Sequence, residues 1–81
     1  MYSRPGCGLC DEARVLILAE RERRPFEYRE VDITGDDKLE LEFGIRIPVV
    51  FVGGVERFEI RLDADELREA VDDAGGDFVR S

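Results

Sequence analysis

Hydrophobic side chains recur every three to four residues over three stretches of this chain, the spacing of helices with one buried face. The buried face predicted for the first stretch, residues 7–23, comprises Leu9, Ala13, Val15, Leu16, Leu18 and Glu20. Acidic residues in its first turn and arginines in its last turn suit the helix dipole. Pro25 then ends the helix, because proline biases the preceding residue away from helical angles.

Two further helices are predicted from end signals as well as from spacing. A Thr-Gly-Asp loop precedes a short helix that should bury Leu39 and Phe43 and end at Gly44 in a left-handed conformation. Asp63 should begin the last helix, with a glutamate at a capping-box spacing. The buried face predicted for this helix comprises Leu67, Ala70, Val71 and Ala74. The Gly-Gly pair that follows is expected to end the helix, which leaves residues 77–81 as a flexible tail.

Four other stretches are predicted as strands. Residues 1–3 are predicted as a short first strand, and residues 26–33 as a second strand. The apolar positions of the second strand change face at Glu30. Residues 47–52 are a continuous apolar run, typical of a strand buried on both faces, and Pro48 can only open it because proline cannot donate to a ladder. A Gly-Gly hairpin turn joins it to residues 55–60, whose interleaved charges indicate an exposed edge.

The predicted elements follow one another in the order β-α-β-α-β-β-α, which is an α/β arrangement. The first two strands, joined by a helix, should pair in parallel through a right-handed crossover. The last two strands should form an antiparallel hairpin. We therefore expect one domain over residues 1–76, with a four-stranded mixed sheet flanked by three helices. A chain of 81 residues has no room for a second core.

Charge and composition argue against several kinds of partner. The formal net charge is −8 at pH 7, which disfavours nucleic acid and anionic membrane surfaces. No stretch is long enough to cross a bilayer, and no stretch has the pattern of an export signal. We therefore expect a cytoplasmic protein, and we expect it to be a monomer. The carboxylates are spread over helix faces and strand edges, so they offer no rival site.

The two cysteines of the chain, Cys7 and Cys10, lie three residues apart at the start of the first predicted helix. At that spacing both side chains project to the same side. Unpaired backbone N–H groups and the helix dipole favour a thiolate at Cys7, and the thiolate is the nucleophile. Without an export signal, such a pair is typical of redox or metal chemistry, whereas a structural disulfide is the alternative. The chain has 0 histidines, which excludes a Cys–His pair and a Cys₂His₂ zinc site.

Two segments of the chain resemble the glutaredoxins. They are Tyr-Ser-Arg-Pro-Gly-Cys-Gly-Leu-Cys-Asp-Glu-Ala at residues 2–13 and Phe-Gly-Ile-Arg-Ile-Pro-Val-Val at residues 43–50. The chain looks most like the small glutaredoxin-like group long catalogued as a domain of unknown function, over nearly all of residues 1–75. This resemblance implies a thioredoxin-like fold and a thiol–disulfide oxidoreductase.

The resemblance also implies roles for individual residues. Cys7 would be the attacking thiolate, and Cys10 would be the more buried resolving thiol. Pro48 would follow a cis peptide bond and face the cysteines, while Ile47 would offer backbone hydrogen bonds to a substrate chain. A trans proline that simply starts a strand is the alternative for Pro48, although X-Pro bonds adopt the cis form at low cost.

Two arginines are candidates for binding an anion. Arg4 stands where glutaredoxins carry a basic residue before the first cysteine, so it would stabilise the Cys7 thiolate or receive a glutathione carboxylate. An ordinary surface arginine is the alternative. Arg46 is a second candidate for the same anion. The implied substrates are protein or small-molecule disulfides, with glutathione as a candidate co-substrate and with no metal or other required cofactor.

The chain departs from the glutaredoxin pattern at the site for glutathione's other end. The family's Gly-Cys/Ser-Asp-Asp segment corresponds to residues 61–65, which lack the glycine and the adjacent acids.

Two alternative functions remain open. In one, Cys7 holds an iron–sulfur cluster or metal in a dimer, which the small residue Gly8 would permit and which needs ligands from a second chain. In the other, the protein is a non-catalytic interaction module that presents the Ile47-Pro48 surface.

Overall fold

The computed structural model describes residues 1–80, with side chains as far as residue 74. Its elements are β1 (Tyr2–Ser3), α1 (Gly8–Arg23), β2 (Val31–Asp32), α2 (Asp37–Phe43), β3 (Val49–Val52), β4 (Val55–Glu59) and α3 (Ala64–Arg80). This is the predicted element order. Over the described residues, no helix is both long enough and apolar enough to pass through a membrane.

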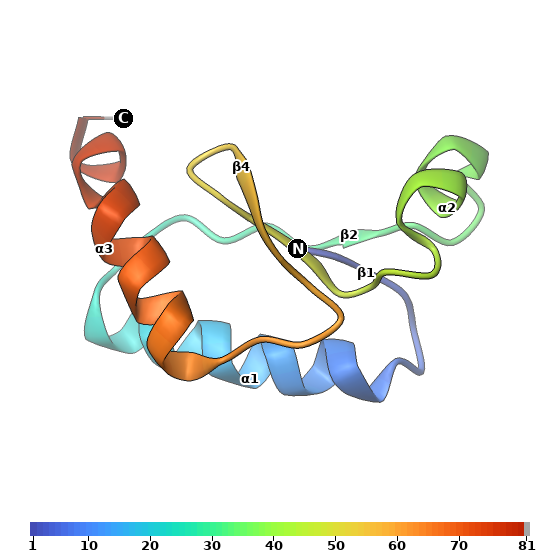
Figure 1. The fold of residues 1–81 in the computed structure, drawn as a ribbon, viewed down its shortest axis with the longest axis horizontal. Helices are drawn as coiled ribbons and strands as arrows, with labels where there is room; N and C mark the ends of the chain where they lie inside the picture. The colour runs from blue at the N-terminus through green and yellow to red at the C-terminus, as the bar shows by residue number, and fades with distance from the viewer. Residues whose placement is uncertain (81) are drawn as a thin grey trace.

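One four-stranded sheet, in the order β2-β1-β3-β4, forms the centre of the molecule (Figure 1). Strands β1 and β2 are parallel, and the β1–β3 and β3–β4 pairs are antiparallel, so the predicted mixed sheet is confirmed. The hairpin turn between β3 and β4 has positive φ at both glycines, 61° at Gly53 and 82° at Gly54. Such a turn matches the twist of its flanking strands, which explains the Gly-Gly pair.

The helices cover the two faces of the sheet unequally. Val50 and Val52 of β3 pack into a core shared with α1 and α3, whereas Val49 packs on the opposite face with Phe43 of α2. Figure 1 shows α1 and α3 next to each other and the short α2 well apart from them. The larger core cluster comprises Met1, Cys10, Ala13, Ile17, Val50, Val52, Leu67, Ala70, Val71 and Ala74.

Helix α1 begins where the sequence predicts, but its buried face is narrower. The buried residues are Cys10, Ala13, Ile17 and Glu20. Val15 is 67% exposed and Leu18 is 41% exposed, so their predicted place on the buried face is wrong. The reason is that only one side of α1 meets other elements, so only one stripe of the helix is covered.

Helix α2 is capped as expected but ends differently from the prediction. The carboxylate of Asp36 accepts a hydrogen bond from the Leu39 N–H at 3.1 Å. Gly44 follows with φ −52°, a right-handed conformation, so the predicted left-handed terminator is wrong. A side chain at position 44 would collide with the Glu40 carbonyl and would approach the Arg4 guanidinium to 3.4 Å. The glycine is therefore required for close packing and not for its backbone angles.

Helix α3 is capped by Asp63, whose carboxylate accepts from the Glu66 N–H at 3.0 Å, as the capping signal predicts. The predicted end at the Gly-Gly pair is wrong, because α3 runs on to Arg80. Each glycine disfavours a helix by only about 1 kcal/mol relative to alanine, which does not forbid one. The domain boundary at 76 and the flexibility of residues 77–81 stay predictions, and Ser81 lies outside the described residues.

The second strand is much shorter than predicted. Residues 26–33 were expected to be a strand, but β2 comprises only Val31–Asp32. Its neighbour β1 comprises only Tyr2–Ser3. The ladder to β2 includes the Val31 N–H donating to the Met1 carbonyl at 2.8 Å and the Ile33 N–H donating to the Ser3 carbonyl at 2.9 Å. The Arg29 carbonyl still accepts from the Met1 nitrogen at 2.7 Å, but no described residue of β1 lies opposite residues 26–29, and these are not assigned to a strand.

Candidate active site

Cys7 is the N-cap residue of α1. Its backbone is extended, with φ −93° and ψ 107°, and its sulfur accepts a hydrogen bond from the Cys10 N–H at 3.1 Å. The Pro-Gly turn places it there, because Gly6 adopts a φ of 77° that other residues rarely take. The sulfur therefore meets an otherwise unpaired N–H group at the positive end of the helix dipole.

Cys10 is fully buried, whereas Cys7 is half-buried, and both thiols are free. Burial, followed by a hydrogen bond to the Cys7 side chain, raises the pKa of the Cys10 thiol to about 11. The Cys10 N–H bond to the Cys7 sulfur, with the three-residue spacing, places both side chains on the same side of the helix start. At neutral pH Cys10 is therefore a protonated donor beside Cys7.

The segment before β3 lies at the same end of the sheet as the cysteine loop. The Ile47–Pro48 peptide bond is cis, as predicted, and Pro48 is fully buried. Since Tyr2 is paired with Val49 in antiparallel register, Ser3 falls opposite Pro48. Figure 1 shows the β1–α1 and α2–β3 connections together at this end. Cys7 and Ile47 both pack against the core cluster that contains Cys10, so the structure brings these predicted site residues together.

The backbone of Ile47 is available to a ligand. Its neighbours are used: the Arg46 and Pro48 carbonyls both accept from the Ile60 N–H, at 3.0 Å and 2.9 Å. Over residues 1–80 no hydrogen bond engages the N–H or the C=O of Ile47. Polar backbone groups that lie at a surface without a protein partner can pair with an extended substrate chain.

Arg4 is directed toward α2. One of its terminal nitrogens lies 3.4 Å from the Glu40 carboxylate, a long contact between half-exposed side chains. Its Nε atom is buried and has no hydrogen-bond partner among the described residues. Within the same residues, no hydrogen bond or ion pair joins Arg4 to the Cys7 sulfur. The guanidinium thus keeps donor capacity that the protein itself does not use.

Arg46 is occupied by the protein. It contacts the carboxylates of Glu56 at 2.8 Å and Glu59 at 3.3 Å, and its guanidinium lies 5.3 Å from the centre of the Phe43 ring. The hydrogen bond to Glu56 is the main cause of a raised pKa at Arg46. These contacts join the end of α2 to β4. Arg46 thus stabilises the packing of α2 against β4, and its predicted binding of an anion stays a prediction.

The sequence interpretation missed an ionic centre behind the thiols. The Glu30 carboxylate accepts from Arg14 at 2.5 Å and 2.7 Å, from the Ser3 hydroxyl at 2.8 Å and from the Tyr28 hydroxyl at 2.9 Å. The hydrogen bonds from Arg14 lower the pKa of Glu30 to about 2, so it stays ionised and is a poor proton acceptor. Its charge contributes, as the weakest cause, to the raised pKa of Cys10. The one sequence signal was the break of alternation at Glu30.

A thiol pair at a helix start, at the same end of the sheet as a cis-proline, is the arrangement that the family resemblance implies, and a family sequence model matches this chain. The sequence model of the Glutaredoxin-like domain (DUF836) matches residues 1–72. The chain belongs to this family. Its fold is thioredoxin-like, and the match includes both cysteines and the Ile47-Pro48 pair. The comparisons with curated proteins and with solved structures gave no match.

The glutaredoxin-like domain has an unusual loop before α3. Ile60 adopts a φ of 67°, a left-handed conformation that is rare for a β-branched residue. Its N–H bonds to two carbonyls of the cis-proline segment fix this conformation. A small cavity of ≈ 70 Å³ separates residues 60–62 from α1. The Asp63 carboxylate caps α3 and so is already used, which agrees with the departure from the glutathione-binding pattern at residues 61–65.

Metal binding by this glutaredoxin-like domain would need ligands from elsewhere. Among the described residues, no group of three or more histidine, cysteine or acidic side chains is placed to hold an ion. Cys7 and Cys10 are two thiols, and a tetrahedral zinc or iron–sulfur site takes four ligands. The two thiols of this single chain therefore do not complete a zinc or iron–sulfur site, and the reaction proposed below uses neither.

Proposed function

We propose that this protein is a thiol–disulfide oxidoreductase. The Cys7 thiolate attacks one sulfur of a substrate disulfide, forms a mixed disulfide with it and displaces the other sulfur as a thiolate. Cys10 then loses its proton to solvent and attacks the Cys7 sulfur. This releases the second substrate thiolate and leaves a Cys7–Cys10 disulfide. The substrate gains two electrons and the dithiol loses two, so an external thiol must restore the reduced protein.

The observation that carries the proposal is the placement of the two sulfurs. Cys7 is half-buried and its sulfur accepts the Cys10 N–H at 3.1 Å, whereas Cys10 is fully buried. The Cys7 sulfur is thus accessible to substrate, whereas the buried Cys10 sulfur would act only in the second step. Formation of the mixed disulfide removes the hydrogen bond to Cys7 that helps to raise the pKa of Cys10. The resolving thiol is therefore easier to ionise after the first step.

Substrate binding is assigned to the surface around Ile47. Its unpaired N–H and C=O would pair with the backbone next to a substrate cysteine, and Pro48 would hold that segment against the thiols. Arg4, whose partly exposed guanidinium has only a long 3.4 Å contact with Glu40, would bind a substrate carboxylate. Glutathione disulfide and protein disulfides both have these features. We place the reaction in the cytoplasm, where external thiols are abundant, and we propose a monomer without a nucleic-acid or membrane partner.

The test uses the full chain with insulin disulfides and with glutathione disulfide as separate substrates. We expect the wild-type protein to reduce at least one of them, and Cys7→Ser to abolish the reaction. Cys10→Ser should stop after the first step, so that a mixed disulfide with glutathione accumulates and is visible by mass spectrometry. Equal rates for wild type and Cys7→Ser would overturn the proposal and leave an interaction module as the alternative.

A further inference from the structure

A small cavity of ≈ 70 Å³ lies next to the thiol pair, between α1 and the connection from β4 to α3. On the α1 side its lining begins at Leu9, which stands between Cys7 and Cys10 in the sequence, and continues to Leu16. Figure 1 shows the β4–α3 connection running beside this part of α1. The small cavity is therefore adjacent to the place where a substrate disulfide would meet Cys7.

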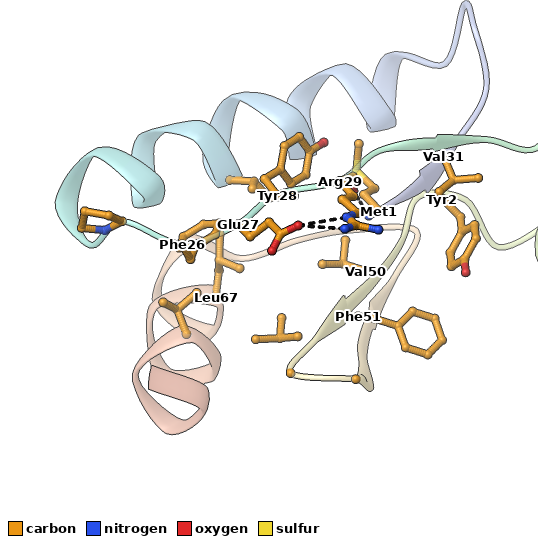
Figure 2. A pocket seen from close by; sticks show the side chains of 16 residues that line it. Met1, Tyr2, Phe26, Glu27, Tyr28, Arg29, Val31, Val50, Phe51 and Leu67 are labelled. Atoms are coloured by element: carbon orange, nitrogen blue, oxygen red, sulfur yellow. Dashed lines mark hydrogen bonds and ion pairs between the residues drawn. The ribbon is translucent and has the colours of Figure 1, made fainter. Parts of the chain in front are cut away.

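A larger cavity of ≈ 870 Å³ lies elsewhere in the molecule. Figure 2 shows Phe26, Val50 and Leu67 around it. Among the described residues, neither cysteine lines this larger cavity, and no residue of α1 before Ile17 lines it. A substrate held at Cys7 would thus contact the small cavity and not the large one.

The wall of the small cavity that faces α1 is held against the cis-proline segment. The Ile60 N–H donates to the Arg46 carbonyl at 3.0 Å and to the Pro48 carbonyl at 2.9 Å, on either side of Ile47. Ile60 itself lines the small cavity, together with Leu62. Direct hydrogen bonds therefore join the wall of the cavity to the segment on which a substrate backbone would pair.

The inside of the small cavity is aliphatic, and its charged groups are exposed. Leu16 and Leu62 line it and also pack against the larger core cluster. Glu12 and Arg61 line it as well, but both residues are exposed, and over the described residues no hydrogen bond or ion pair engages either side chain. An apolar centre with a hydrated polar rim is the usual composition of a surface that binds another polypeptide.

The volume of the small cavity limits what it can hold. Pockets that bind whole small molecules measure about 300–1,000 Å³. An apolar cavity of about 150 Å³ in another protein holds one benzene molecule, so ≈ 70 Å³ suits a group of about half that size. A branched aliphatic side chain fits this description, and its transfer from water to aliphatic walls is favourable. A charged group would lose hydration there without a buried partner.

The position of the small cavity along α1 indicates which substrate residue would reach it. Its lining residues on α1 are centred about 8 Å beyond Cys7, at about 1.5 Å per residue. An extended chain covers about 6.6–6.8 Å in two residues, and side chains two residues apart point to the same side. The side chain that enters the cavity is therefore two residues from the reacting cysteine, whereas the residue next to that cysteine faces away.

We propose that the small cavity binds an aliphatic side chain located two residues from the reacting cysteine of a polypeptide disulfide. This inference rests on the thiol–disulfide exchange proposed above and names its preferred substrate class. Glutathione has a γ-glutamyl and a glycyl residue beside its cysteine and carries no aliphatic side chain. The protein therefore reduces suitable polypeptide disulfides in preference to glutathione disulfide, because only they gain this contact as Cys7 attacks.

The test follows oxidation of the reduced protein by peptide disulfides in a single turnover. Each reaction converts one peptide disulfide to two thiols and the protein dithiol to a Cys7–Cys10 disulfide. The parent peptide has blocked ends and a central cysteine between two pairs of serines, and leucine replaces one serine at a time. Each rate constant is divided by the rate constant of the same peptide disulfide with dithiothreitol, which has no cavity, so that intrinsic reactivity cancels.

We expect leucine at one end of the peptide, two residues from the cysteine, to raise this ratio about tenfold. Leucine next to the cysteine should leave the ratio close to that of the parent peptide, because its side chain faces the other way. Glutathione disulfide should react like the parent peptide. The proposal would be overturned by equal ratios for parent and leucine peptides, by an equal gain at every position, or by a ratio for glutathione disulfide that matches the best leucine peptide.

A matched pair of variants tests the small cavity itself. Ile60→Asn makes one wall polar, and asparagine tolerates the φ of 67° at this position. This variant should lose most of the preference for leucine, and an unchanged preference would contradict the proposal. Ile45→Asn is the control, because Ile45 is 94% exposed and does not line the cavity, so the preference should remain.

The peptide series decides by itself if Ile60→Asn fails to fold. It also separates this inference from the proposed function on which it rests. A wild-type protein that is oxidised by none of the disulfides would overturn the oxidoreductase function and the inference with it. A protein that is oxidised by all of them at equal ratios would overturn the inference alone.

Discussion

The Cys7 sulfur and the Cys10 N–H are joined by a 3.1 Å hydrogen bond across the first turn of α1. This position is normally occupied by a serine, threonine or asparagine oxygen that caps a helix. In this protein the cap is also the proposed nucleophile. The same sulfur therefore both caps the helix and, in the proposed reaction, attacks the substrate, and substitutions of Cys7 should separate the two roles.

Replacing Cys7 by serine or by alanine should affect activity equally but stability differently. Serine restores an N-cap oxygen, whereas alanine leaves the Cys10 N–H without a partner, which we expect to lower the free energy of unfolding by about 1 kcal/mol relative to serine. Urea unfolding of the two variants measures this difference. Identical unfolding midpoints would show that the sulfur does not act as a cap.

Stability should fall at alkaline pH because of Cys10. Burial raises the pKa of the folded-state thiol from 9.0 to about 11, so the protonated thiol is favoured by folding. This contribution is complete below pH 9 and is lost as the pH rises toward 11. The free energy of unfolding of wild type relative to Cys10→Ala should therefore decrease over that interval, by about 2–3 kcal/mol. Tyr28, whose pKa is also raised by burial, is present in both proteins and cancels.

The burial of Cys10 should also be visible in the rates at which the two cysteines are alkylated. At pH 7 iodoacetamide should modify Cys7 much faster than Cys10, because Cys10 is fully buried and protonated. In urea the two rates should converge, since the helix and the core no longer exist. Mass spectrometry of the modified peptides gives both rates. Faster modification of Cys10 in the folded protein would reverse the assignment of attacking and resolving thiols.

Glu30 should stabilise the protein at neutral pH but not in acid. The Arg14 hydrogen bonds lower its pKa from 4.5 to about 2, so its contribution is complete above pH 4.5 and is lost as the pH falls toward 2. Because solvent partly screens these contacts, we expect Glu30→Gln to lower the free energy of unfolding by about 1 kcal/mol at pH 7, with the difference from wild type vanishing near pH 2. Glu27→Gln is the matched control, because the Glu27 side chain is 72% exposed and pairs with exposed Arg29. The control should change little at either pH.

Arg4 and Arg46 should separate binding from stability. If Arg4 binds a substrate carboxylate, Arg4→Gln should raise KM for glutathione disulfide several-fold with little change in kcat. Arg46→Gln should instead lower the free energy of unfolding, because it breaks the ion pairs with Glu56 and Glu59, and it should leave KM unchanged. Steady-state kinetics and urea unfolding of both variants decide this. The opposite pattern would exchange the two roles.

Features that depend on local signals could be predicted from the sequence. The cysteine spacing places a thiol at the start of α1, the Gly-Gly pair forms the hairpin turn, and Asp63 caps α3. The cis-proline before β3 came from the family resemblance and not from the residues themselves. For the cysteine pair, the hairpin turn and the cap of α3, a few neighbouring residues determine the conformation, so a sequence pattern is sufficient.

Features that depend on distant partners could not be predicted. Residues 26–29 have strand-like composition, but no described residue of β1 lies opposite them. Glu30 looks like an interruption of a strand until Ser3 and Arg14 converge on it from other segments. In both cases the deciding contact lies outside the local pattern.

The unequal burial of the two free thiols also has a practical consequence for anyone who stores this protein. Cys7 is half-buried whereas Cys10 is fully buried, so a thiol-reactive dye or an oxidant should reach the Cys7 sulfur first. Purification in the presence of a reductant therefore preserves the dithiol.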